Sequence, residues 1–137
     1  MAGVKRYQDL AWWQLAAELE KLVFELTETG PMARDFKFRD EIRDSSSSAT
    51  RNIAEGFGRF LPADHARFLR IAKASLMETH SSVSSGFNRG YFSEKDKDSM
   101  QRLCGRSGKA ATGLIRYLET QIPPSSPGRR RKRRRRS

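Results

Sequence analysis

The sequence predicts an all-α fold, an antiparallel up-down-up-down bundle of four helices. Apolar residues recur every three or four positions through four long stretches, and glycine and proline separate these stretches. No stretch shows the alternation typical of a strand between turn signals. Because the connections are short, successive helices are expected to be antiparallel neighbours. The 137 residues suffice for one domain with a buried core.

The first two predicted helices are separated by a glycine and a proline. The first covers residues 7–29, and Gly30 and Pro31 are expected to end it, because proline cannot continue a helix. The second covers residues 33–57. Their apolar faces contain, in order, Leu15, Leu19, Leu22, Val23 and Leu26, and then Phe38, Ile42, Ala49, Ile53 and Phe57.

The third and fourth predicted helices have clearer start signals. The third begins at Pro62, where proline is favourable in the first turn, and continues to Gly90. The fourth follows Ser93, a candidate N-cap, and Pro123 stops it. Their apolar faces contain Leu69, Ala72, Leu76, Val83 and Phe87 in the third helix, and Met100, Leu103, Cys104, Ala111, Leu114 and Leu118 in the fourth.

Charge divides the chain into two parts. Residues 1–121 are predicted to form the bundle, and residues 122–137 a Pro/Ser hinge with an Arg-rich tail that is expected to be disordered. The formal net charge is +11, but the tail supplies +8 of it and residues 1–128 only +3. The tail cations are Arg129, Arg130, Arg131, Lys132, Arg133, Arg134, Arg135 and Arg136.

Several classes of protein are disfavoured by composition. No apolar run approaches the roughly 20 residues that a membrane span needs. The first residues are not followed by the apolar stretch of a secretory signal, and one cysteine, Cys104, cannot form an internal disulfide. The expected compartment is therefore the cytoplasm.

Polar residues form a second stripe on the two middle helices. Ser48, Asn52, Glu55 and Arg59 are spaced by three or four residues in the second helix, and Ser75, Glu78, Ser82 and Ser85 are spaced in the same way in the third. This spacing keeps side chains on one side of a helix. The stripes predict a hydrogen-bonded contact with a neighbouring helix or another subunit, and the alternative is an ordinary solvent face.

Two segments, residues 48–59 and 68–78, resemble the signature of a bacterial family of four-helix-bundle proteins, which includes those encoded within intervening sequences of large-subunit ribosomal RNA genes. The string Asn-Ile-Ala-Glu-Gly at residues 52–56 is its most specific part, and residues 9–14 resemble the family's opening pattern. The four consecutive serines at 45–48 and the basic tail depart from it. The resemblance implies a homopentamer and, through a distant relative, the accessory protein of diversity-generating retroelements, contact with RNA and a reverse transcriptase. The motif residues are interpreted as structural or interfacial, with a ligand or partner site as the alternative: Ser48, Asn52, Glu55, Gly56, Ser75 and Glu78.

Catalytic and metal-binding patterns are weak, so no cofactor, metal or catalytic residue is expected. A di-iron bundle needs Glu-x-x-His pairs, whereas Glu78 and His80 are two residues apart. Cys104 lies on an apolar face, where a core role is expected. A rival hypothesis is a small metal-free helical ribonuclease that uses Arg59 and His65, which five residues separate.

The favoured function is non-catalytic binding of nucleic acid, RNA rather than DNA, or of a nucleoprotein partner, by an oligomer. Adjacent cations displace counterions from phosphates, although a solubilising tail is the alternative. Body cations expected to extend this surface near the junction of the middle helices are Arg51, Arg59, Arg67, Arg70 and Lys73. The alternative function is a protein-interaction scaffold that uses the polar stripes and an exposed Trp12 or Trp13.

Overall fold

The computed structural model describes residues 3–124, so the predicted tail cations lie outside the described residues. The all-α prediction is confirmed: residues 3–124 contain four α-helices, two short 3-10 turns and no strand. The α-helices are α1 (Ala11–Leu26), α2 (Phe36–Phe57), α3 (Pro62–Asn88) and α4 (Glu94–Thr120), and the 3-10 turns are η1 (Tyr7–Asp9) and η2 (Pro31–Ala33).

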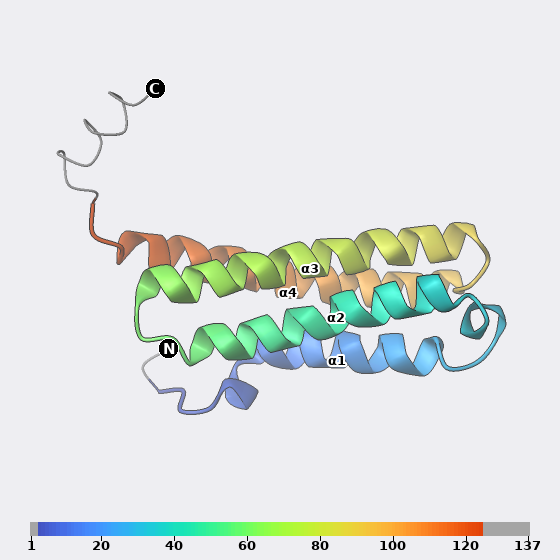
Figure 1. The fold of residues 1–137 in the computed structure, drawn as a ribbon, viewed down its shortest axis with the longest axis horizontal. Helices are drawn as coiled ribbons and strands as arrows, with labels where there is room; N and C mark the ends of the chain where they lie inside the picture. The colour runs from blue at the N-terminus through green and yellow to red at the C-terminus, as the bar shows by residue number, and fades with distance from the viewer. Residues whose placement is uncertain (1–2, 125–137) are drawn as a thin grey trace, which may run out of the picture.

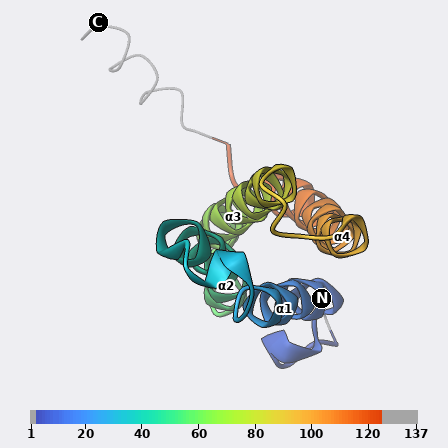
Figure 2. The ribbon, with the colours of Figure 1, turned by 90° about the vertical axis from the view of Figure 1, so that its right-hand side faces the viewer.

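The four helices lie side by side as a bundle. Figure 1 shows the α1–α2 and α3–α4 connections at one end, and the α2–α3 connection at the other end together with the C-terminal end of α4. Viewed along the bundle in Figure 2, the helices form a ring in the order α1, α2, α3, α4. Each helix packs on the next one, and α4 closes the ring against α1.

The first connection is longer than the sequence predicts. Helix α1 ends at Leu26 rather than at residue 29. The Thr27 hydroxyl, just beyond this end, donates to the Val23 carbonyl at 2.7 Å and accepts from Arg43 Nε at 2.8 Å, which ties the end of α1 to α2. Gly30 instead lies in the connection with a φ of 80°, which glycine adopts without strain.

The second helix begins at Phe36 rather than at residue 33. The Asp35 carboxylate caps it by accepting from the Phe38 backbone N–H at 3.3 Å. The same carboxylate accepts from the Tyr91 hydroxyl at 2.6 Å and pairs with Arg89 at 3.2 Å. The Tyr91 hydrogen bond is the main cause that holds the pKa of Asp35 below its usual value. The cap therefore also ties α2 to the α3–α4 connection.

The starts of the third and fourth helices are confirmed. Pro62 is the first residue of α3, and the Ser93 hydroxyl accepts from the Asp96 backbone N–H at 3.1 Å as the N-cap of α4. The first N–H groups of a helix have no partner within it, so the Ser93 hydroxyl supplies an acceptor, whereas Pro62 has no N–H that would need one.

The core has two halves along the bundle. The half near the α1–α2 connection contains Leu19, Val23, Met32, Phe38, Ile42, Ala49, Leu76, Val83, Phe92, Met100, Leu103 and Cys104. The half near the α2–α3 connection contains Leu10, Trp12, Ala16, Ile53, Ala66, Leu69, Ala72, Ala111, Ile115 and Leu118. Most of these positions match the predicted apolar faces, so burial of apolar area accounts for the bundle.

A glycine of α3 allows aromatic rings to meet in the first half of the core. The Phe38 ring lies 5.1 Å from Tyr91 and 6.0 Å from Phe92, measured between ring centroids. Gly86 is buried beneath them, and a Cβ atom there would lie 2.5 Å from Phe92 Cε2 and 2.7 Å from Phe38 Cζ. No side chain larger than hydrogen fits unless these rings move.

Candidate functional site

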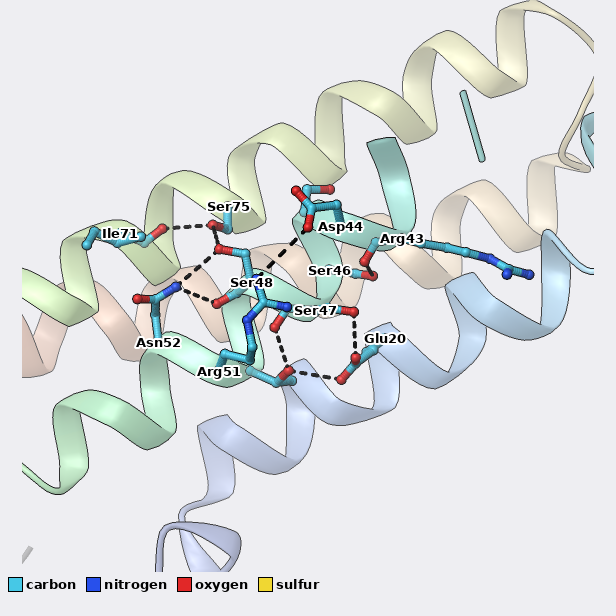
Figure 3. A network of polar contacts seen from close by, with 12 residues as sticks. Glu20, Arg43, Asp44, Ser46, Ser47, Ser48, Arg51, Asn52, Ile71 and Ser75 are labelled. Carbon is cyan, nitrogen blue, oxygen red and sulfur yellow. Dashed lines mark hydrogen bonds and ion pairs between the residues drawn. The ribbon is translucent and has the colours of Figure 1, made fainter. Parts of the chain in front are cut away.

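The four consecutive serines of α2 contact both neighbouring helices. On the α3 side the Ser45 and Ser48 hydroxyls lie 2.8 Å from those of Thr79 and Ser75 respectively (Figure 3 shows the Ser48–Ser75 pair). The order of these two pairs along the chain is opposite in the two helices. We call these four residues the α2–α3 polar seam.

The α1 side of α2 has a carboxylate at its centre. Glu20 of α1 accepts from the Ser47 hydroxyl at 2.7 Å and from the Thr50 hydroxyl at 2.9 Å (Figure 3). Each oxygen of this partly buried carboxylate therefore has a hydroxyl donor. The serine run therefore replaces apolar packing on α2 with directed bonds to α1 and α3.

The motif residues separate into an inner and an outer group. Asn52 donates from Nδ2 to the Ser48 carbonyl at 2.8 Å and to its hydroxyl at 3.1 Å, which joins it to the polar seam (Figure 3). Glu55 and Glu78 are exposed, and Glu55 pairs with Arg59 at 3.3 Å. The two carboxylates are therefore at the surface, where a partner can reach them.

Gly56 lies where α2 and α3 approach closely. A Cβ atom there would lie 3.0 Å from His65 Cδ2 and 3.3 Å from the His65 carbonyl oxygen. The missing side chain thus lets the first turns of α3 pack against the end of α2.

Residues from both the N-terminal part of the chain and the 48–59 segment line a hollow of about 430 Å³. Motif residues Arg51, Asn52 and Glu55 line it from α2, and Tyr7 and Trp13 line it from the N-terminal segment and α1. Of the tryptophan pair, Trp12 is buried in the core, whereas Trp13 is half-buried with its ring 5.2 Å from Tyr7. The side chain within reach of solvent is therefore that of Trp13.

The five predicted body cations lie on three parts of the surface instead of one. Arg59 and Arg67 share the α2–α3 end. Arg70 and Lys73 lie on the α3–α4 side, where Arg70 pairs with Glu119 of α4 at 3.1 Å and Lys73 lines a groove. Arg51 lies on the α1 side of α2, 4.0 Å from Asp44.

Arg59 and Arg67 both contact one aromatic ring. Their guanidinium carbons lie 4.7 and 4.5 Å from the centroid of Phe68, within the range of a cation–π interaction. Arg59 is also paired with Glu55, whereas Arg67 makes no ion pair within residues 3–124. Arg67 thus has guanidinium donors available for an anion.

The sequence analysis did not identify the exposed apolar segment that joins α2 to α3. Phe60 is 97% exposed and Leu61 is 56% exposed, in the short segment between α2 and α3. The available signal was an apolar pair between Gly58 and Pro62, outside the periodic face of either helix. We call Arg59, Phe60, Leu61, Arg67 and Phe68 the α2–α3 tip.

The C-terminal end of α4 lies at the same end of the bundle as the tip. Figure 1 shows both at the end opposite the α1–α2 connection, and the Arg70–Glu119 ion pair ties the last turn of α4 to α3. The segment that leads to the tail cations therefore begins beside the tip.

The groove between α3 and α4 has a volume of about 270 Å³ and is mainly apolar. Leu76, Met77 and Cys104 line it, with the backbone of Gly105 and Gly108. Burial raises the pKa of the Cys104 thiol to about 12, so the nucleophilic thiolate is scarcely populated near neutral pH.

Arg59 and His65, the pair of the ribonuclease hypothesis, do not share one exposed site. His65 is 7% exposed, and its Nε2 atom is buried with no hydrogen-bond partner within residues 3–124. Arg59 lies outside, over Phe68. Burial lowers the pKa of His65 below its ordinary value of 6.5.

The free energy of unfolding is expected to fall as the pH drops from 7 to 5. The unfolded chain takes up the His65 proton near pH 6.5 and the folded chain only at lower pH, so this stability is complete above 6.5 and lost below it. His65→Met should remove this part of the pH dependence in urea unfolding at pH 5, 6, 7 and 8. His80→Gln, at the exposed histidine, is the control. An unchanged slope in His65→Met would contradict the expectation.

Residues 3–124 offer neither a metal-binding cluster nor a membrane-spanning helix. They contain no group of three or more His, Cys, Asp or Glu residues arranged to hold a metal ion. None of the helices in this range is both long and apolar enough to cross a bilayer.

Comparisons with known proteins agree with the fold and the motif. The structure is similar, with a TM-score of 0.70 and 18% identity, to a crystal structure from Bacteroides thetaiotaomicron described as a protein of unknown function from the S23 ribosomal protein family, over 77% of this chain and 98% of that one. No curated protein matches the sequence. The family model of the 23S rRNA-intervening sequence protein matches residues 8–113, which include α1, α2, α3 and most of α4. The chain therefore belongs to the 23S rRNA-intervening sequence protein family.

Proposed function

We propose that this chain is a non-catalytic, cytoplasmic, oligomeric protein that binds nucleic acid, RNA rather than DNA, or a nucleoprotein. One observation carries the proposal. The segment that leads to eight consecutive cations starts at the end of the bundle where Arg59 and Arg67 lie. The run of tail cations therefore follows, in sequence, from the end of the bundle that bears the tip.

Phosphates are the partner that this chemistry fits best. Each cation that neutralises a phosphate releases a counterion, which favours binding without regard to sequence. Arginine also presents donors in a fork that matches phosphate oxygens. The eight tail cations include no aromatic residue, so the tail alone is expected to position nucleic acid rather than to read bases.

Assembly multiplies the effect of the tail. We propose an antiparallel up-down-up-down bundle that forms a homopentamer, as the resemblance to family members implies. The outward Glu55 and Glu78 and the hollow beside Trp13 offer polar and aromatic surface for contacts between copies. Several tails on one oligomer raise avidity above the affinity of one tail by orders of magnitude.

Binding without catalysis is consistent with the titratable groups that residues 3–124 contain. Cys104 and His65 are buried, and burial disfavours the charged form of each. The carboxylate of Glu20 is held by two hydroxyls between helices, which is a structural arrangement.

The test combines light-scattering mass with binding of a fluorescent single-stranded RNA, for the full-length chain and for a chain that ends at Pro124. The full-length chain is expected to bind RNA with a mass near that of a pentamer. The shortened chain should keep the mass and lose most of the affinity, and any remaining affinity would report the tip. A full-length chain that is monomeric and binds neither RNA nor DNA would overturn the proposal.

A further inference from the structure

Phe60 is the most exposed of the large apolar side chains within residues 3–124. Its exposed fraction of 97% compares with 66% for Met77, the next largest value. Single exposed apolar residues are common on proteins. Phe60 differs because Leu61 continues the apolar surface and because arginines flank the connection on both sides in sequence.

The connection that bears Phe60 is held by backbone hydrogen bonds. The N–H groups of Gly58 and Arg59 donate to the carbonyls of Glu55 and Gly56 at 3.2 and 3.0 Å, and the His65 N–H donates to the Leu61 carbonyl at 3.0 Å. The backbone on both sides of Phe60 is therefore fixed, while its ring faces solvent. Binding at Phe60 therefore does not have to order the backbone of this connection.

We propose that Phe60 is a stacking platform for an unpaired base, so that the α2–α3 tip binds single-stranded nucleic acid. This inference rests on the proposed function and specifies its substrate class. Stacking on an aromatic ring is available to every base, because every base has a π-face. Little sequence preference is therefore expected.

The cations near Phe60 complement the backbone of such a strand. Arg59 and Arg67 lie over Phe68, and their guanidinium groups are held close to the ring that follows the connection in α3. Arginine beside an aromatic platform is the usual combination in proteins that bind single strands without sequence preference. The tip supplies a base contact that the tail lacks.

Duplex nucleic acid is expected to use the tail alone. Its base faces are covered by neighbouring base pairs, and exposing one of them costs unstacking and unpairing energy. The tip thus predicts a preference for single strands that phosphate contacts by themselves do not provide.

The experiment compares Phe60→Ala, Phe60→Trp and the control Phe36→Ala in the full-length chain. Phe36 is 61% exposed with Arg39 4.9 Å from its ring, but it lies at the opposite end of the bundle, at the start of α2. The probes are one mixed-sequence RNA of twenty nucleotides that contains 2-aminopurine, and the same RNA annealed to its complement. Affinity, 2-aminopurine fluorescence and light-scattering mass are measured at one fixed salt concentration.

Phe60→Ala is expected to lower the single-strand affinity by about 5- to 150-fold, which is the range of one stacked base, and to leave duplex affinity unchanged. Phe60→Trp should restore the affinity and the quenching of 2-aminopurine, and Phe36→Ala should resemble the unmodified chain. Equal losses on both probes, or no loss, would overturn the inference while RNA binding itself stands. A smaller mass in Phe60→Ala would overturn it in favour of a contact between copies. An unmodified chain that binds neither probe would overturn the inference and the proposed function together.

Discussion

Between 50 and 200 mM salt, the affinity of the full-length chain for single-stranded RNA is expected to fall about 2,000-fold, because eight phosphate contacts give a slope of about −5.6 in log K against log salt. The tail provides all eight of these cations in adjacent positions. The measurement is a fluorescence anisotropy titration at four salt concentrations.

Two variants of the tail separate charge from chain length. Replacing the eight cations with glutamine should remove most of the slope and most of the low-salt affinity. Replacing the seven arginines with lysine should keep the slope, because the charge is kept, and should weaken binding only through the lost guanidinium fork. A glutamine variant with the slope of the unmodified chain would show that the body, not the tail, binds the phosphates.

Gly86→Ala is expected to lower the free energy of unfolding by about 3 kcal/mol, at the upper end of the cost of overpacking a core. The added Cβ atom would come within 2.5 Å of Phe92 Cε2 and 2.7 Å of Phe38 Cζ, and both rings are buried and packed together. The strain outweighs the roughly 1 kcal/mol by which alanine is favoured over glycine within a helix. Thermal and urea unfolding measure the change.

Gly113→Ala is the matched control, because it makes the same substitution within a helix but in open space. Gly113 is exposed in α4, and apart from the adjoining helix backbone no atom lies within 4 Å of an added Cβ. This variant is expected to gain up to about 1 kcal/mol from helix propensity alone. If both variants shift stability in the same direction, the close approach at Gly86 is not the dominant effect.

The fold could be predicted because the spacing of apolar residues shows which face of each helix is buried. Leu69, Leu76 and Val83 repeat at seven residues and are all buried, and proline and the Ser93 cap mark helix starts by local chemistry. The start of α2 was less accessible. The Asp35 cap is supported by Tyr91 and Arg89, which lie more than fifty residues away in sequence.

The candidate site was only partly predictable, because helical spacing orders residues around one helix without fixing which neighbour they meet. Ser48 and Ser75 were singled out by their spacing and are in direct contact. Arg51 and Arg70 were placed near the α2–α3 junction on their position in the sequence, but they turn toward α1 and α4. Phe60 belongs to no periodic face, so its exposure depends on the three-dimensional path of the connection and does not follow from spacing.

The serine run of α2 has a consequence for how precisely the helices align. Leucine contacts tolerate sliding, since dispersion and burial depend little on direction, whereas a hydrogen bond is lost within about an ångström of displacement. A shift of α2 along α3 would break the Ser45–Thr79 and Ser48–Ser75 bonds at once. These small hydroxyls therefore fix the axial register of α2 against α3. Through that register they also fix how far Phe60 projects from the end of the bundle.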